Sequence, residues 1–175
     1  MLLVLGVGLS FFLSLGPTGL VSLTIAFTLS FFLHELAHKF LAQHFGLWAE
    51  FRLTMQGVLI TLVSTLLPLF KIISPGAVMI AGPVTKVTAG KTALSGPVVN
   101  IILSALCAIV AVSTQNISFW VVSWINALFA FFNLIPFGVM DGLKVFWWNK
   151  TVWTLAFIAS IMLMTYAYGP ALAAL

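Results

Sequence analysis

Long apolar stretches separated by short polar joints occupy most of the 175-residue chain. They cover residues 1–15, 20–45, 57–73, 92–113, 117–137 and 151–168. Only 6% of the residues are charged, whereas a soluble domain carries about 25%. A chain this poor in charge cannot cover a water-exposed surface. The pattern therefore predicts an integral membrane protein, with residues 1–175 forming a single membrane-embedded domain.

The few charges exclude one class of partner. Lys and Arg number 7 against 3 Asp and Glu, for a formal net charge of +4. These charges are too sparse for binding nucleic acid, and in a membrane protein they are expected to set the topology. The single cysteine, Cys107, excludes an internal disulfide and a zinc site built from several thiolates.

Three ionisable residues fall within five consecutive positions of one apolar stretch, in the sequence His34-Glu35-Leu36-Ala37-His38. Ionisable groups inside membrane segments are costly and usually serve a function. Positions i and i+4 share a helix face, so the imidazoles of His34 and His38 should converge on one point. Glu35 lies beside them, placed to act on a metal-bound water. This is the arrangement of a zinc metalloprotease, with two His ligands and a Glu base.

A catalytic zinc ion needs a third protein ligand and an open position. His44 has the spacing of the third metzincin ligand, but the glycine turn of that family is absent, so a continuing helix should point His44 away. Glu50 is close to Arg52 and is expected to be a surface carboxylate. Asp141 follows an apolar stretch among proline and glycine residues that expose backbone. Asp141 is therefore the favoured third ligand.

Three motifs together resemble the site-2 protease family of intramembrane zinc metalloproteases. They are the sequence at 34–38, Asn133-Leu134-Ile135-Pro136 with Met140-Asp141-Gly142, and Gly96-Pro97-Val98-Val99-Asn100. The resemblance covers residues 20–145. It implies that one catalytic zinc ion is bound by His34, His38 and Asp141, and that Glu35 is the general base.

The resemblance also implies that Asn133 and Asn100 position the substrate backbone or the developing oxyanion. Hydrogen bonding between helices is the alternative role for both side chains. Two features depart from the family pattern. Val139 stands where the family has a second proline, and the apolar stretch 57–73 is absent from the simplest family members.

We expect an all-α polytopic membrane protein with five to six transmembrane segments, one of them re-entrant, and a small β element near the active site. The sequence also predicts turns at 16–19 and over 85–92, and a polar joint over 138–150. The metal lies near the C-terminal end of the 20–45 stretch, and Asp141 follows the 117–137 stretch. Both C-terminal ends must then lie on one membrane side, so segment 57–73 cannot make a single crossing. It should be re-entrant or lie along the active-site cleft.

The basic residues agree with this topology. All of them fall at or near the side of the expected active site: Lys39, Arg52, Lys71, Lys86, Lys91, Lys144 and Lys150. The opposite side, near residues 16–19, 113–117 and 169–175, has no Lys or Arg. The positive-inside rule then places the active site toward the cytoplasm, in a protein of the cell membrane.

The expected function is hydrolysis of peptide bonds in or near transmembrane segments of membrane-protein substrates, as in regulated intramembrane proteolysis. The substrate must unwind locally, and a strand at Ala77–Ala81 could hold it by β-addition; an ordinary connecting strand is the alternative. Two other functions compete. A metal transporter would need repeats or a polar path, which the sequence lacks. A non-catalytic scaffold would not need the intact Glu35.

Overall fold

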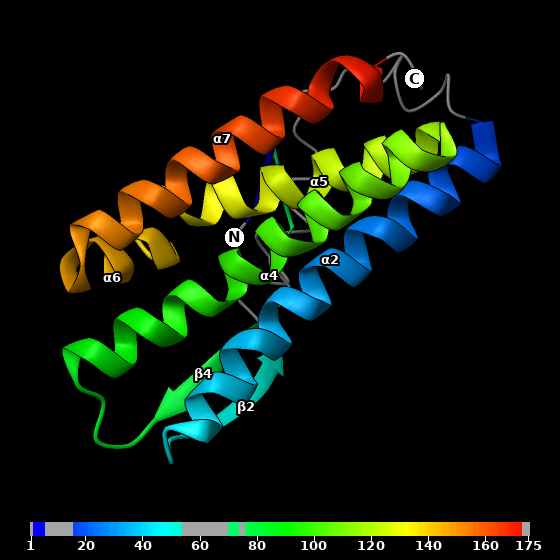
Figure 1. Ribbon diagram of the computed structural model, residues 1–175. Coiled ribbons are helices and arrows are strands. Elements are labelled where there is room, and N and C mark those ends of the chain that lie inside the picture. Colours follow the sequence, from blue (N-terminus) through cyan, green and yellow to red (C-terminus); the bar gives the residue numbers. More distant parts are fainter. Residues whose placement is uncertain (1, 6–15, 54–69, 74–75, 173–175) are drawn as a thin grey trace.

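Four long helices lie side by side in the computed structural model, which describes residues 2–5, 16–53, 70–73 and 76–172 (Figure 1). They are α2 (Gly16–His44), α4 (Lys86–Thr114), α5 (Ile117–Asn133) and α7 (Lys150–Leu172). A short helix, α6 (Asp141–Trp148), lies between α5 and α7 in sequence. Helix α4 packs against α2, α5 and α6, and α5 packs against α7. The predicted helical character of the chain is thus confirmed.

Fewer helices qualify as membrane spans than the sequence predicts. Among the described residues, Lys86–Thr114 and Lys150–Ala171 are long and apolar enough to cross a membrane, and Ile117–Asn133 is apolar but shorter. Of the expected stretches 1–15 and 57–73, residues 6–15 and 57–69 lie outside the described part. Their described ends form the strands β1 (Leu2–Leu5) and β3 (Phe70–Ile73), which pair antiparallel. Within the described residues, the predicted count of five to six transmembrane segments is therefore not reached.

A second two-stranded sheet lies beside the C-terminal end of α2 (Figure 1). Its strands β2 (Trp48–Leu53) and β4 (Gly76–Ala81) pair antiparallel. The strand predicted at Ala77–Ala81 and the β element near the active site are both confirmed. Because Leu53 pairs with Gly76, the two ends of the intervening segment are neighbours. The predicted re-entrant segment 57–73 lies, apart from Phe70–Ile73, outside the described residues.

Two predicted turns are wrong, because both are the first turns of helices. Residues 16–19 begin α2, where Pro17 is tolerated because the amide of a first-turn residue has no partner within the helix. Residues 86–92 belong to α4. Thr85 and Thr88 cap this helix reciprocally, each side chain accepting from the other's backbone N–H, at 3.1 and 2.9 Å. The threonine side chains that suggested a turn instead form hydrogen bonds that stabilise the start of this helix.

The joint predicted over 138–150 contains helix α6, which begins at Asp141. Gly138 has a φ of +61°, a conformation that favours glycine, and so turns the chain after α5. Gly142 packs so closely on α5 that a Cβ there would collide with the carbonyl oxygen of Leu134. The start of α6 is thereby held against the C-terminal end of α5. This contact fixes the position of Asp141.

Candidate metal site

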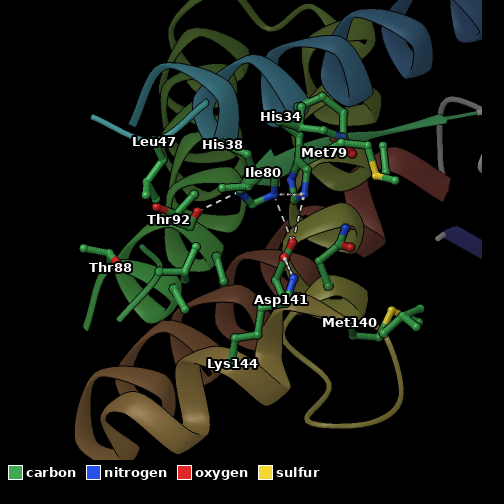
Figure 2. A pocket seen from close by; sticks show the side chains of 18 residues that line it. His34, His38, Leu47, Met79, Ile80, Thr88, Thr92, Met140, Asp141 and Lys144 are labelled. Carbon is green, nitrogen blue, oxygen red and sulfur yellow. Dashed lines mark hydrogen bonds and ion pairs between the residues drawn. The ribbon is translucent and has the colours of Figure 1, made fainter. Parts of the chain in front are cut away.

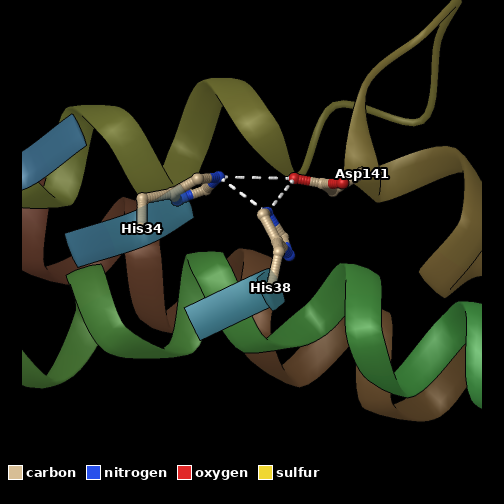
Figure 3. A group of neighbouring side chains, drawn as sticks. All are labelled: His34, His38 and Asp141. Atoms are coloured by element: carbon tan, nitrogen blue, oxygen red, sulfur yellow. Dashed lines mark hydrogen bonds and ion pairs between the residues drawn. The ribbon is translucent and has the colours of Figure 1, made fainter. Parts of the chain in front are cut away.

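Three side chains from two helices meet at one point between α2 and α6 (Figure 3). The Nε2 atoms of His34 and His38 lie 3.4 and 3.0 Å from Oδ2 of Asp141. The two Nε2 atoms are 3.1 Å apart. Among the described residues these three form a group that could hold a metal ion. Residues separated by more than a hundred positions are thus brought together as the sequence predicts.

Hydrogen bonds on the far side of each ring set the tautomers. The Nδ1 of His38 lies 2.7 Å from the carbonyl oxygen of Thr92, which can only accept, so this Nδ1 carries a proton. The Nδ1 of His34 lies 2.6 Å from Oδ1 of Asn100, whose amide nitrogen donates to the carbonyl of Ser30. His34 therefore also donates from Nδ1. In the neutral form of each ring, Nε2 then presents a lone pair toward Asp141.

The donor set fits a zinc ion. When both imidazoles are neutral, two Nε2 lone pairs and a carboxylate oxygen all accept, so a cation between them would stabilise their approach to 3.0–3.4 Å. Ligands at about 2.0–2.1 Å from a tetrahedral zinc ion are roughly 3.3 Å apart. The observed spacings of 3.4, 3.0 and 3.1 Å lie close to this value. Two imidazoles and one carboxylate also leave a fourth position open.

The Asp141 carboxylate is held in its charged form. Burial alone would raise its pKa, but when the imidazoles of His38 and His34 are protonated, their charge and hydrogen bonds act in the opposite direction, and the net pKa lies well below the usual range. A metal cation bound in place of these protons would have the same effect. Lys144, one turn along α6, adds a cation 3.9 Å from Oδ1. Asp141 is therefore an anionic ligand at any physiological pH.

Glu35 lies beside the group of His34, His38 and Asp141, called the metal cluster below, but is not one of its members. Its Oε2 accepts a 3.1 Å hydrogen bond from the backbone N–H of Val78 in β4. The side chain is half-buried and lines the same cavity as the two histidines. This position suits a group that acts on a ligand of the metal, as the sequence motif suggests.

A cavity of about 360 Å³ opens onto the cluster (Figure 2). Residues 77–80 of β4 form part of its wall, α4 contributes Thr88 and Thr92, and Asn133 and Met140 lie near Asp141. The hydroxyl of Thr92 is buried and, within the described part of the chain, lacks a hydrogen-bond partner. The cavity is thus lined by strand β4, by Thr92 and by the three candidate metal ligands.

The other two candidates for the third ligand lie elsewhere. Glu50 forms a 3.0 Å ion pair with Arg52 on β2, and both side chains are more than half exposed. His44 is exposed at the end of α2, where its ring contacts Phe45. Helix α2 does continue to His44, which is why this ring points away from the cluster.

The two asparagines of the family-like motifs occupy different places. Asn133 lines the cavity, and its amide donates to the carbonyl of Phe129 at 2.9 Å. Asn100 is fully buried behind His34 and bonds across helices to His34, Ser30 and Asn126. Its contacts are those of the interhelical alternative. A substrate contact stays a prediction and has structural support only for Asn133.

Sequence reasoning missed three contributors to this site. The carbonyl of Thr92 and the side chain of Asn126 depend on helix packing that no local pattern reveals. Gly96 belongs to a family-like motif, but the motif does not predict its contact with the histidine rings. A Cβ at Gly96 would lie 2.7 Å from Cε1 of His34 and collide with Nε2 of His38. Glycine at this position lets α4 approach the metal cluster.

Comparison with known proteins agrees with this geometry. The chain is 33% identical over 148 residues to a Methanocaldococcus jannaschii protein named "Putative zinc metalloprotease MJ0611". The match covers 81% of this chain and 78% of that protein. No family model matches the sequence, and no solved structure matches the fold.

Proposed function

Because this chain belongs to the zinc metalloprotease family of its M. jannaschii relative, we propose that it is an intramembrane protease of the site-2 type. Zinc is its cofactor, and the cluster of His34, His38 and Asp141 fits that ion. The substrates would be membrane proteins, cleaved in or near a transmembrane segment. The observation that carries this proposal is the convergence of three electron-pair donors at one end of an apolar helical bundle.

The chemical roles follow from position. A zinc ion held by His34, His38 and Asp141 would lower the pKa of a bound water toward ~7 and polarise a peptide carbonyl. Glu35 takes the water proton as general base and later gives it to the leaving amine. The bond from Val78 holds the Glu35 carboxylate at the cavity wall, within the space where these transfers occur.

Strand β4 supports binding of an extended substrate. The N–H of Val78 points to Glu35 and into the cavity, and so away from β2. The edge of β4 opposite β2 thus lies on the side of Glu35, and an unwound substrate segment could add there as a further strand. Asn133 lines the same cavity and is suited to bind the substrate backbone or the developing oxyanion.

The outer surfaces of the helices suit a lipid bilayer. Large apolar side chains are exposed along α4 and α7, including Leu106, Ile109, Leu155 and Met162. Large apolar side chains exposed along the length of two helices suit contact with lipid rather than with water. With the basic residues gathered at the metal end, we propose that this end faces the cytoplasm across the cell membrane.

Replacing the proposed base tests this function. The variant Glu35→Gln keeps the size of the side chain but cannot accept a proton, so cleavage of a reporter with one transmembrane helix should fall ~10²–10⁴-fold. Its zinc content should equal that of the wild type. Glu50→Gln is the matched control, because Glu50 is an exposed carboxylate bound to Arg52, and it should cleave normally.

The assay uses full-length protein in vesicles of defined lipid. Equal cleavage by Glu35→Gln and wild type would refute the assigned base. Zinc uptake by the same vesicles, without cleavage of any reporter, would instead favour the transporter alternative.

A further inference from the structure

A series of hydrogen bonds between buried side chains connects three helices and ends at His34. It starts at Asn126 in α5, whose Oδ1 accepts from the amide nitrogen of Asn100 in α4 at 2.9 Å. The Oδ1 of Asn100 lies 2.6 Å from Nδ1 of His34 in α2. The exposed fractions are 1% for Asn126, 0% for Asn100 and 2% for His34. Among the described residues, the two asparagines therefore bond only to each other, to His34 and to the backbone, whereas Nε2 of His34 faces His38 and Asp141.

Bonds to backbone carbonyls fix the orientation of both asparagine amides in this hydrogen-bond series. Asn126 donates its amide N–H to the carbonyl of Val122 at 2.9 Å, which leaves its Oδ1 facing Asn100. Asn100 donates both amide hydrogens, to Asn126 and to the carbonyl of Ser30 at 3.3 Å. Since carbonyls only accept, reversing either amide would place two acceptors against each other. Only Oδ1 of Asn100 is left for His34, which must donate from Nδ1.

We propose that Asn126, acting through Asn100, is a positioning residue that fixes the tautomer and ring orientation of His34. The proposal rests on the proposed zinc ligation by His34. Neither asparagine touches the metal position. Metal-binding histidines commonly donate their second ring nitrogen to an outer partner, and loss of that partner weakens metal binding. Here the outer partner is itself oriented by a residue on a third helix, so the packing of α4 on α5 sets the affinity for zinc.

The same helix pair contains a matched control. Ser123 of α5 and Ser104 of α4 are both fully buried, with their hydroxyls 3.1 Å apart. Ser123 also donates to the carbonyl of Ser104 at 2.9 Å. They lie about one turn away from Asn126 and Asn100 along each helix. This pair stabilises the α4–α5 contact without any bond to His34.

Zinc affinity and cobalt spectra test the proposal with full-length protein in detergent. The dissociation constant for zinc is measured by competition with a chelator, and Co²⁺ in the same site reports ligand geometry by its visible absorption. Asn100→Leu should weaken zinc binding ~10- to 100-fold. Asn126→Leu, one bond further away, should weaken it roughly 3- to 10-fold and change the cobalt spectrum.

Two further variants separate positioning from packing. Asn126→Asp keeps an acceptor oxygen toward Asn100. Burial favours the protonated carboxyl, which can donate to the carbonyl of Val122, so zinc affinity should stay near the wild-type value. Ser123→Ala should lower the midpoint of thermal unfolding while leaving zinc affinity and the cobalt spectrum unchanged. If Asn126→Leu does not fold, Asn126→Ser carries the same prediction, because its side chain is too short to reach Asn100.

Wild-type affinity and an unaltered cobalt spectrum in the Asn126 variants would overturn the proposal. It would also be overturned if Ser123→Ala weakened zinc binding as much as Asn126→Leu, since packing alone would then explain the effect. A His34→Ala variant distinguishes failure of this proposal from failure of the proposed metal site. If it bound zinc like the wild type, the proposed metal site itself would be wrong.

Discussion

A single methyl group on α4 should disturb the metal cluster, because Gly96 lies directly against both histidines. In Gly96→Ala the new Cβ would be 2.6 Å from Cε1 of His38 and 2.7 Å from Cε1 of His34. Ordinary van der Waals contact begins at 3.4 Å, and Nε2 of His38 lies closer still, so the rings or the helices must separate by at least roughly 0.8 Å. The position of the added Cβ is fixed by the backbone of α4, so the methyl group cannot rotate away from the rings.

This displacement is large for a catalytic site. Functional side chains must be held within about 0.5 Å of their productive positions, and a misplacement of about 1 Å can cost ~10²-fold in rate. We therefore expect kcat/KM to fall ~100-fold in Gly96→Ala, with a parallel loss of zinc affinity. Overpacking should also lower the free energy of unfolding by about 1–3 kcal/mol.

Chelator competition and cleavage of a membrane reporter measure the two effects. Gly169→Ala in α7 is the control, because a Cβ there meets no atom within 4 Å. That variant should bind zinc and cleave like the wild type. If Gly96→Ala did the same, α4 would not hold the histidine rings, and the contact derived above would be refuted.

The remaining predictions concern Asp141 and the orientation in the membrane. In Gly142→Ala the Cβ would collide with the carbonyl of Leu134, so the start of α6 should shift and zinc affinity should fall ~10-fold; unchanged affinity would show that this packing does not place Asp141. In a chain without its native cysteine, a membrane-impermeant maleimide applied to intact cells should label Gln115→Cys but not Lys86→Cys. The reverse labelling pattern would contradict the cytoplasmic orientation.

The residues of the metal cluster could be predicted because the two histidines form a local pattern and carboxylates are rare in this chain. His34 and His38 lie four positions apart, and an uninterrupted helix brings such residues to one face regardless of the rest of the fold. Carboxylates are so scarce in this chain that few candidates for a third ligand existed. The β4 strand was also predictable, since an apolar run between two glycine–proline breaks has few other structures open to it.

The supporting contacts were not predictable, because they depend on how helices pack. Nothing in the local sequence pairs Asn126 with Asn100 or turns the carbonyl of Thr92 toward His38. These bonds exist only once α2, α4 and α5 are side by side. The family-like motif pointed to Asn100, but the resemblance suggested a substrate contact instead of the bond to His34.

Errors at the helix starts have a different cause. Residues 16–19 and 86–92 contain the glycine, proline and threonine residues that are typical of turns, yet these residues also suit the first turn of a helix. The short helix α6 was missed for a similar reason. Composition alone does not distinguish a capped helix start from a loop.

The zinc content of purified variants tests the central claim most directly. We predict that wild-type protein retains one zinc ion per chain, that Asp141→Ala loses it, and that His44→Ala and Glu50→Gln keep it. His34 and His38 would then share the ion with Asp141. Full zinc retention in Asp141→Ala, or loss of zinc in the His44 or Glu50 variant, would contradict the proposed metal site.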